Sequence, residues 1–155
     1  MAKAKEDVRK RSHKPLETEE RGNERYFRML NAMDKDSYAR PHKHPNEACV
    51  ESFRSLRGKA QVVFFNESGE ITDIQPLDDE TENEVQIPPN RVHTIVATED
   101  CVLYEEMKQP ADGYQSGRDK IEPEWAPVEL IDNKPPSEGI EYLGYLRQRV
   151  RDLRF

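Results

Sequence analysis

Short apolar runs separated by turn-forming residues fill the middle of the chain. No long helical period interrupts them, and the separators are rich in Gly, Pro, Asn, Asp and Ser. Runs of this length and spacing are typical of β-strands. The predicted strands are 26–33, a segment from 38 onward, 51–56, 60–65, 71–77, 84–87, 93–97 and 102–107. The pattern predicts a mainly β fold, as a single antiparallel β-barrel or jelly roll.

The C-terminal part of the chain has a different period. Beyond Pro135 and Pro136, Ser137 is a candidate N-cap for an amphipathic helix. Its apolar positions are three or four residues apart and form one stripe: Ile140, Leu143, Leu146, Val150 and Leu153. This stripe must be buried against the barrel or against a second subunit, and we expect it to form a homodimer.

The N-terminal residues 1–22 are basic and contain almost no apolar side chains beyond Val8 and Leu16. Such a segment cannot bury enough surface to become ordered, so we expect a flexible arm. It could be a nucleic-acid tail, but a solubilising or subunit-embracing role is favoured by the acidic total charge. The resulting division is an arm at 1–22, a barrel domain at 23–128, and a linker with the helix at 129–155.

Length and charge narrow the class of protein. The chain has 155 residues, which suits one domain, and a formal net charge of −7, which argues against a general nucleic-acid binder. It has no apolar run long enough to span a membrane and no signal-peptide pattern, so we expect a cytoplasmic protein with reduced Cys49 and Cys101. The expected partner is a small-molecule ligand.

The segment Arg-Pro-His-Lys-His-Pro at residues 40–45 carries two of the four histidines. Pro41 and Pro45 disfavour helix, and in an extended chain His42 and His44 project to the same side, about 6.6 Å apart. On a helix they would diverge. The spacing therefore predicts an imidazole pair on an extended segment, within reach of one ion.

Two later residues extend this pair to a possible ligand set. Glu51 begins a predicted strand that ends at Gly58, and His93 begins another strand after Pro88 and Pro89. Three imidazoles suit zinc, iron, nickel or copper, and the carboxylate widens the choice to manganese or iron(II). The residues predict a site for one divalent transition metal, held by His42, His44, Glu51 and His93. Glu51 could instead point outward and pair with a lysine.

These motifs resemble those of the cupin superfamily. Its first motif is His-x-His, a short spacer, Glu, six residues and Gly, which His42, His44, Glu51 and Gly58 match. Its second motif is Pro-x-Gly-x-x-His, which residues 88–93 match with Asn90 in place of glycine. Asparagine tolerates the left-handed conformation, so this turn should persist. The six residues between His44 and Glu51 exceed the usual spacer.

The long spacer and residues 26–45 look like the WbuC-type cupin fold metalloproteins. The resemblance continues through Phe64-Phe65, Glu106-Met107-Lys108 and Trp125-Ala126-Pro127. It implies a β-barrel metal site and, more weakly, a sugar or nucleotide-sugar substrate, since the group is named from O-antigen sugar gene clusters. It does not imply a settled reaction.

Strand alternation suggests four catalytic candidates. Tyr38 and Arg40 share parity with His42 and His44, so they could act as a proton relay and an anion clamp. Glu106 and Lys108 share one face of a late strand and could be an acid/base pair. The alternatives are a packed ring for Tyr38, a salt bridge for Arg40, and a Glu106–Lys108 ion pair.

Three functions remain open at this point. The first is a metal-dependent enzyme, an isomerase or epimerase acting on a small polar molecule. The second is an iron-dependent dioxygenase. The third is a non-catalytic module that binds a small ligand and has a structural metal, for which a dry cavity lined by Phe53 and Ile95 would be evidence.

Overall fold

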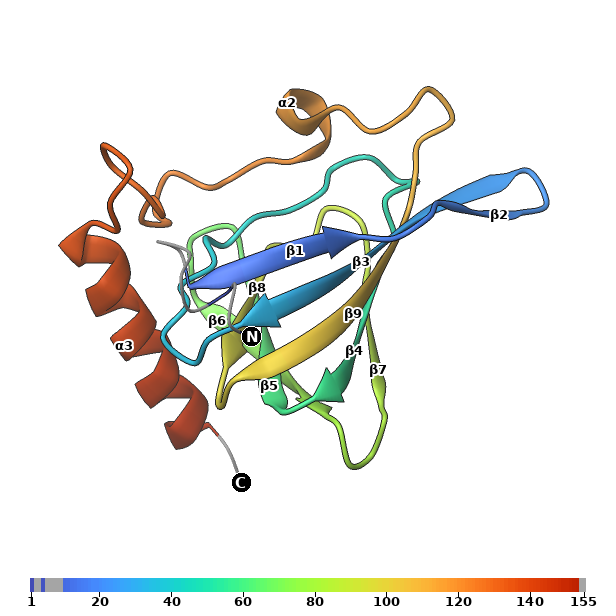
Figure 1. Ribbon diagram of the computed structural model, residues 1–155. Coiled ribbons are helices and arrows are strands. Elements are labelled where there is room, and N and C mark those ends of the chain that lie inside the picture. Colours follow the sequence, from blue (N-terminus) through green and yellow to red (C-terminus); the bar gives the residue numbers. More distant parts are fainter. Residues whose placement is uncertain (2–3, 5–9, 154–155) are drawn as a thin grey trace.

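A computed structural model describes residues 1, 4 and 10–153 and shows two antiparallel sheets packed face to face (Figure 1). The sheets do not close into a barrel, so the fold is a jelly roll, with mainly β structure as predicted. The strands are β1 (Arg11–Pro15), β2 (Glu19–Arg21), β3 (Glu24–Met33), β4 (Glu51–Arg57), β5 (Lys59–Phe65), β6 (Ile71–Asp78), β7 (Glu84–Ile87), β8 (His93–Ala97) and β9 (Cys101–Lys108). The helices are α2 (Ser116–Asp119) and α3 (Ser137–Asp152).

The larger sheet has the order β1-β3-β9-β4-β7, with β2 paired to β3, and the smaller sheet has the order β6-β5-β8. The chain passes repeatedly from one sheet to the other, so residues from both sheets meet at the same end of the sandwich. The predicted strands are confirmed except for the one from residue 38 onward. That segment is extended, but it pairs only through isolated bridges at His42 and Lys43.

Strand β5 explains why one run of the sequence is apolar at every position. Val62 and Phe64 point into the core between the sheets, whereas Val63 and Phe65 belong to a second buried cluster with α3. A strand covered on both faces needs apolar residues at successive positions rather than at alternate ones. The inter-sheet core and the helix are therefore anchored by the same strand.

The C-terminal helix is confirmed, with two differences from the prediction. Leu143, Leu146 and Val150 are buried on the outer face of the small sheet, but Ile140 is 61% exposed. The N-cap is Pro136, which makes no side-chain capping bond, and Ser137 is the first helical residue instead of the predicted cap. The molecule's own sheet covers most of the stripe, and the homodimer stays a prediction. Neither helix of the described residues is long and apolar enough to cross a membrane.

The predicted flexibility of the N-terminal arm is not found in residues 10–22, which form two paired strands. Strand β1 pairs with β3 from Arg11↔Met33 to Pro15↔Met29, and β2 pairs with the start of β3. An added edge strand is held by main-chain hydrogen bonds and needs few apolar side chains of its own. Residues 2–3 and 5–9, the rest of the predicted basic arm, lie outside the described residues.

Candidate metal centre

The four predicted ligands converge at one end of the sandwich. Glu51 is the first residue of β4 in the larger sheet, and His93 is the first residue of β8 in the smaller sheet. His42 joins β8 through two backbone hydrogen bonds with His93, of 3.0 and 2.9 Å. One ligand atom from each of His42, His44, Glu51 and His93 lies within 4.8 Å of the others. This is the arrangement that the sequence predicts.

The turn before His93 keeps the two motifs together. Asn90 has φ of 63°, in the left-handed region that glycine usually occupies, and its backbone N–H donates to the His44 carbonyl at 2.6 Å. Asparagine tolerates this conformation better than other non-glycine residues. The prediction that the turn persists with Asn90 in the glycine position is confirmed.

Backbone carbonyls fix the orientation of all three imidazoles. In each ring Nδ1 lies within hydrogen-bond distance of a carbonyl oxygen, so Nδ1 carries the proton and donates it. The unprotonated Nε2 of a neutral ring is then the atom available to a metal ion. The carbonyl partners are Arg40 for His42 at 3.0 Å, Asp119 for His44 at 2.8 Å and Arg91 for His93 at 2.8 Å.

The atoms that face the centre lack hydrogen-bond partners. Oε1 of Glu51 lies 3.0 Å from Nε2 of His93 and 3.5 Å from Nε2 of His44, and all three atoms are buried without a hydrogen bond. With neutral rings these atoms are all acceptors, and an unpaired buried acceptor costs about 1–3 kcal/mol. A proton or a metal cation among them would remove that cost. The donor set therefore fits a divalent metal ion.

Burial and mutual charge set the protonation of the cluster. Burial, reinforced by the charge of His93, lowers the pKa of His42 well below its usual value. Burial also opposes the charge of His44, but the Glu51 carboxylate, 3.5 Å from its Nε2, outweighs burial and raises the pKa of His44. Burial opposes the charge of Glu51, yet His44 and His93 hold the pKa of this carboxyl well below its usual range. Glu51 is thus an ionised candidate ligand.

A cavity of about 480 Å³ adjoins the cluster. Its wall includes the four candidate ligands, and much of the remainder is apolar, formed by Phe27, Met29, Phe53, Ile95 and Met107. Polar side chains that the sequence pattern did not predict also line it: Arg11, His13, Asn31, Thr94, Glu105, Gln109, Tyr114 and Lys120. A cavity with a wide apolar wall and a few polar groups is typical of a small-molecule site.

Glu105, which the sequence pattern did not predict as a site residue, contacts the candidate ligand Glu51. It lies opposite Phe53 in the β4–β9 register, accepts a hydrogen bond from Asn31 at 3.2 Å, and shares a hydrogen bond with Glu51. Burial, followed by the negative charge of Glu51, raises the pKa of Glu105 well above its usual value. A protonated Glu105 can donate to Glu51 and so orient the ligand carboxylate.

Glu106 and Lys108, two of the predicted catalytic residues, do not line the cavity. Glu106 accepts hydrogen bonds from Tyr104 at 2.7 Å and Arg21 at 2.8 Å, and Lys108 pairs with Glu24 at 2.8 Å, all on the outer face of the sheet. The apolar residues at 103 and 107 share parity with Glu105. That alternation was the signal that could have identified Glu105 as the inward carboxylate.

Tyr38 and Arg40 also lie away from the cavity. The Tyr38 hydroxyl donates to the Pro127 carbonyl at 2.6 Å, and Nε of Arg40 donates to the Ala126 carbonyl at 3.0 Å. They hold a later loop against the sandwich. The cavity is lined instead by Ala39, so strict alternation does not continue across Pro41 to the histidines. Side chains alternate between two faces only in a regular strand, and this segment is not one.

Comparisons with known proteins give a fold and no activity. A family model described as "Domain of unknown function (DUF6016)" matches residues 1–77, just under half of the chain. A search of curated proteins found no match. The fold is shared with protein SO0799 from Shewanella oneidensis (TM-score 0.51, 13% identity, 71% of this chain and 72% of that chain).

Two further solved structures resemble the chain at similar levels. One is a conserved protein of unknown function, SPY1581, from Streptococcus pyogenes (TM-score 0.50, 13% identity, 64% of this chain and 75% of that chain). The other is an RmlC-like cupin protein from Desulfovibrio desulfuricans (TM-score 0.48, 12% identity, 63% of this chain and 80% of that chain). The WbuC-type resemblance stays a prediction. The chain has a jelly-roll fold, which it shares with SO0799 and SPY1581, and the residues of both predicted motifs lie at one end of the sandwich.

Proposed function

We propose that the chain binds one divalent transition-metal ion through His42, His44, Glu51 and His93, and that the ion serves a small-molecule site in the adjoining cavity. The observation that carries this proposal is the set of buried, unpaired atoms: Oε1 of Glu51 and Nε2 of both His44 and His93. Iron, zinc, nickel and manganese are all compatible with these donors. The bound ion would supply Lewis acidity toward a ligand oxygen or, if it is iron, activation of dioxygen.

The chain's own residues would prepare the ligand set before an ion arrives. Three carbonyls hold Nδ1 of the imidazoles, so the rings need little reorientation. Glu105 and its hydrogen bond from Asn31 fix the far side of Glu51. Such supporting contacts are worth about 10- to 100-fold in metal affinity. A chain that orients its ligands in this way favours a permanent metal centre.

The adjoining cavity favours a ligand-binding role over a purely structural ion. Structural metal sites are closed by protein ligands, whereas sites that act on a ligand keep one face accessible. Here the candidate ligands themselves form part of the wall of the cavity of about 480 Å³. We propose an isomerase or epimerase acting on a small polar molecule such as a sugar derivative, with an iron-dependent dioxygenase as the alternative. The apolar wall that includes Phe53 and Ile95 favours, as a further alternative, a non-catalytic module that binds a small ligand.

Elemental analysis of the purified full-length protein tests the metal centre. We expect about one equivalent of metal per chain, and loss of most of it in His42→Ala and in His93→Ala, since each removes an imidazole donor. The matched control is His13→Ala, which removes the remaining histidine, one that is not part of the cluster. Unchanged metal content in both ligand variants would overturn the proposal.

A further inference from the structure

The residues before and after Lys120 both contact the segment that carries His42 and His44. On one side the Asp119 carbonyl lies 2.8 Å from Nδ1 of His44. On the other side Ile121 and Lys43 exchange two backbone hydrogen bonds of 2.9 Å. The backbone of Lys120 is therefore tied to the same segment that carries His42 and His44, and its side chain lines the cavity.

The neighbouring charges of this loop are paired within the protein. Arg118 binds Asp112 at 2.6 Å and Asp119 at 2.8 Å, and Glu122 lies 3.7 Å from Arg40. In the described part of the chain, by contrast, no carboxylate lies within 4.0 Å of the Lys120 ammonium. Lys120 is only half-buried, so its charge remains available to a molecule in the cavity.

The carboxyl group that could neutralise Lys120 from inside the cavity is already engaged. Glu105 accepts a hydrogen bond from Asn31 at 3.2 Å and shares another with Glu51. Lys120 lines the same cavity as the four candidate ligands, and its neighbours Asp119 and Ile121 contact the segment that carries His42 and His44. An anion bound beside the ion would meet this cation.

The rest of the cavity calls for a ligand with an apolar part. Phe27, Met29, Phe53 and Met107 form a wall along the larger sheet, and Ile95 contributes from the smaller one. Methionine and phenylalanine surfaces offer dispersion contacts and no hydrogen bonds, and thioethers adapt to irregular shapes. A fully hydroxylated ligand would lose water along this wall without replacement bonds.

We propose that the cavity takes a monocarboxylate with an apolar body, whose carboxylate is bound by Lys120 while the body lies against the wall formed by Phe27, Met29, Phe53 and Met107. This inference rests on the proposed metal centre, and it replaces the sugar derivative as the expected substrate with a ligand of another chemical class. Arg11 also lines the cavity, but its guanidinium is paired with Glu129 at 2.6 Å, so Lys120 is the cation available to the ligand. One such ammonium matches a singly charged carboxylate better than a phosphate monoester, which carries close to two charges at neutral pH.

Binding of three matched probes tests this assignment. Phenylacetate, phenylacetamide and phenyl phosphate share the same ring, and their affinities for the metal-loaded full-length protein are measured by calorimetry at millimolar concentration. We expect phenylacetate to bind about tenfold more tightly than the amide, as one charge-assisted contact provides. Lys120→Gln should remove this preference, Lys120→Arg should keep it, and the exposed-residue control Lys134→Gln should leave it unchanged.

The outcomes separate this inference from the metal assignment. Equal affinity for acid and amide, no binding of either, tighter binding of phenyl phosphate, or a preference that survives in Lys120→Gln would each overturn the carboxylate assignment. Metal content is measured on the same samples. A protein that holds its metal but shows no acid preference contradicts only the inference. A protein that holds no metal contradicts the proposed function. In that case the preference for phenylacetate over phenylacetamide, and its loss in Lys120→Gln, still test the role of Lys120.

Discussion

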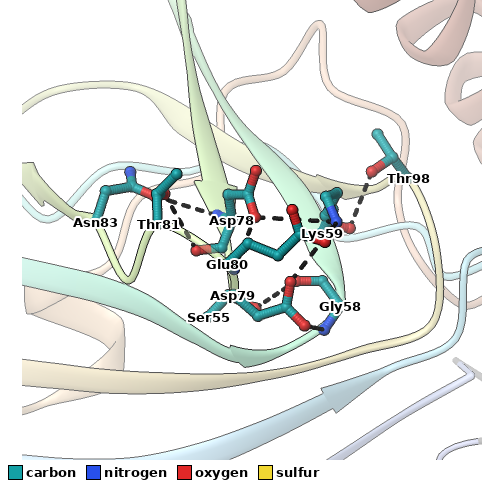
Figure 2. A network of polar contacts seen from close by, with 9 residues as sticks. All are labelled: Ser55, Gly58, Lys59, Asp78, Asp79, Glu80, Thr81, Asn83 and Thr98. Atoms are coloured by element: carbon teal, nitrogen blue, oxygen red, sulfur yellow. Dashed lines mark hydrogen bonds and ion pairs between the residues drawn. The ribbon is translucent and has the colours of Figure 1, made fainter.

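The two ends of strand β4 solve the same electrostatic problem in different ways. At its start, Oε1 of Glu51 is buried and faces two imidazole nitrogens. Beyond its other end, about 20 Å away, Asp79 is a second carboxylate with a buried oxygen. Nζ of Lys59 lies 3.7 Å from this oxygen, Oδ1 (Figure 2). One carboxylate has a cation from the chain itself. The other does not.

The far end is also closed by a dense set of hydrogen bonds. Asp79 accepts from the Gly58 backbone at 2.9 Å, the Ser55 hydroxyl donates to the Gly58 carbonyl at 2.6 Å, and Thr98 donates to the Lys59 carbonyl at 3.0 Å (Figure 2). Oδ1 of Asp79, like Oε1 of Glu51, is buried without a hydrogen bond, but the chain places a lysine ammonium beside it. Among the described residues no lysine or arginine lies within 4.0 Å of Glu51, so the unpaired atoms at that end indicate a cation supplied from outside.

Glu51→Gln should give the largest contrast between the ends. In the presence of chelator the unfolding free energies of the variant and of the wild type give the two metal-free baselines. With metal at a hundredfold excess over Kd, the wild type should gain about 2.7 kcal/mol and the variant almost nothing. Urea unfolding with and without metal measures both. Glu106→Gln, on the outer face, should keep the full gain, and a metal-dependent gain in Glu51→Gln would contradict the ligand role.

Gly58→Ala should damage the closed end and leave the metal centre intact. Gly58 has φ of +80°, and an added Cβ would collide with the Asp100 carbonyl oxygen. We expect a loss of at least about 2 kcal/mol in unfolding free energy. Gly22→Ala is the matched control, because Gly22 has φ of +64° but nothing within 4 Å of an added Cβ. Equal losses in the two variants would show that the collision contributes nothing.

Metal affinity should depend on pH through one proton. In the metal-free protein Glu51, outweighing burial, raises the pKa of His44 above 6.5, so metal binding below that pKa must displace a proton from this ring. His42 stays neutral because burial lowers its pKa. The apparent affinity should fall about tenfold per pH unit below the His44 pKa and stay constant above it. Metal titrations at several pH values measure the slope, and a flat profile would contradict this account.

Lys59→Met should have the smallest effect. Nζ of Lys59 lies within 4.0 Å of Asp78, Asp79 and Glu80, so its removal leaves like charges together at the closed end. The lysine is partly exposed and solvent screens these pairs, so we expect a modest fall in melting temperature that metal does not change. Lys134→Met is the exposed control. A fall that metal reverses would mean that the two ends are coupled.

The candidate ligands could be found from the sequence because their signal is local. Prolines on both sides of the His42–His44 pair enforce an extended backbone, and Glu51 and His93 stand at strand starts marked by turn residues. The four catalytic candidates lie away from the cavity for a related reason. Their assignment assumed unbroken alternation, but Pro41 lies between Arg40 and the histidines, and in β9 the inward carboxylate is Glu105.

Other parts of the site carry no local signal at all. The Asp119 carbonyl that orients His44 belongs to a residue 75 positions later in the chain. Lys120 reaches the cavity because Ile121 pairs with Lys43, a contact that no periodicity predicts. Strand β1 is likewise ordered by pairing with β3 rather than by its own apolar residues.

Local patterns along the chain specify the strands, the C-terminal helix and the four residues that could hold a metal ion. Hydrophobic period and turn chemistry act between residues that are close along the chain, so they can be read directly. Three features depend on the tertiary structure: which face of each strand lies toward the core, which carbonyls orient the imidazoles, and which cation lines the cavity. Those features arise from contacts between distant segments, whose register is fixed by packing of the whole fold.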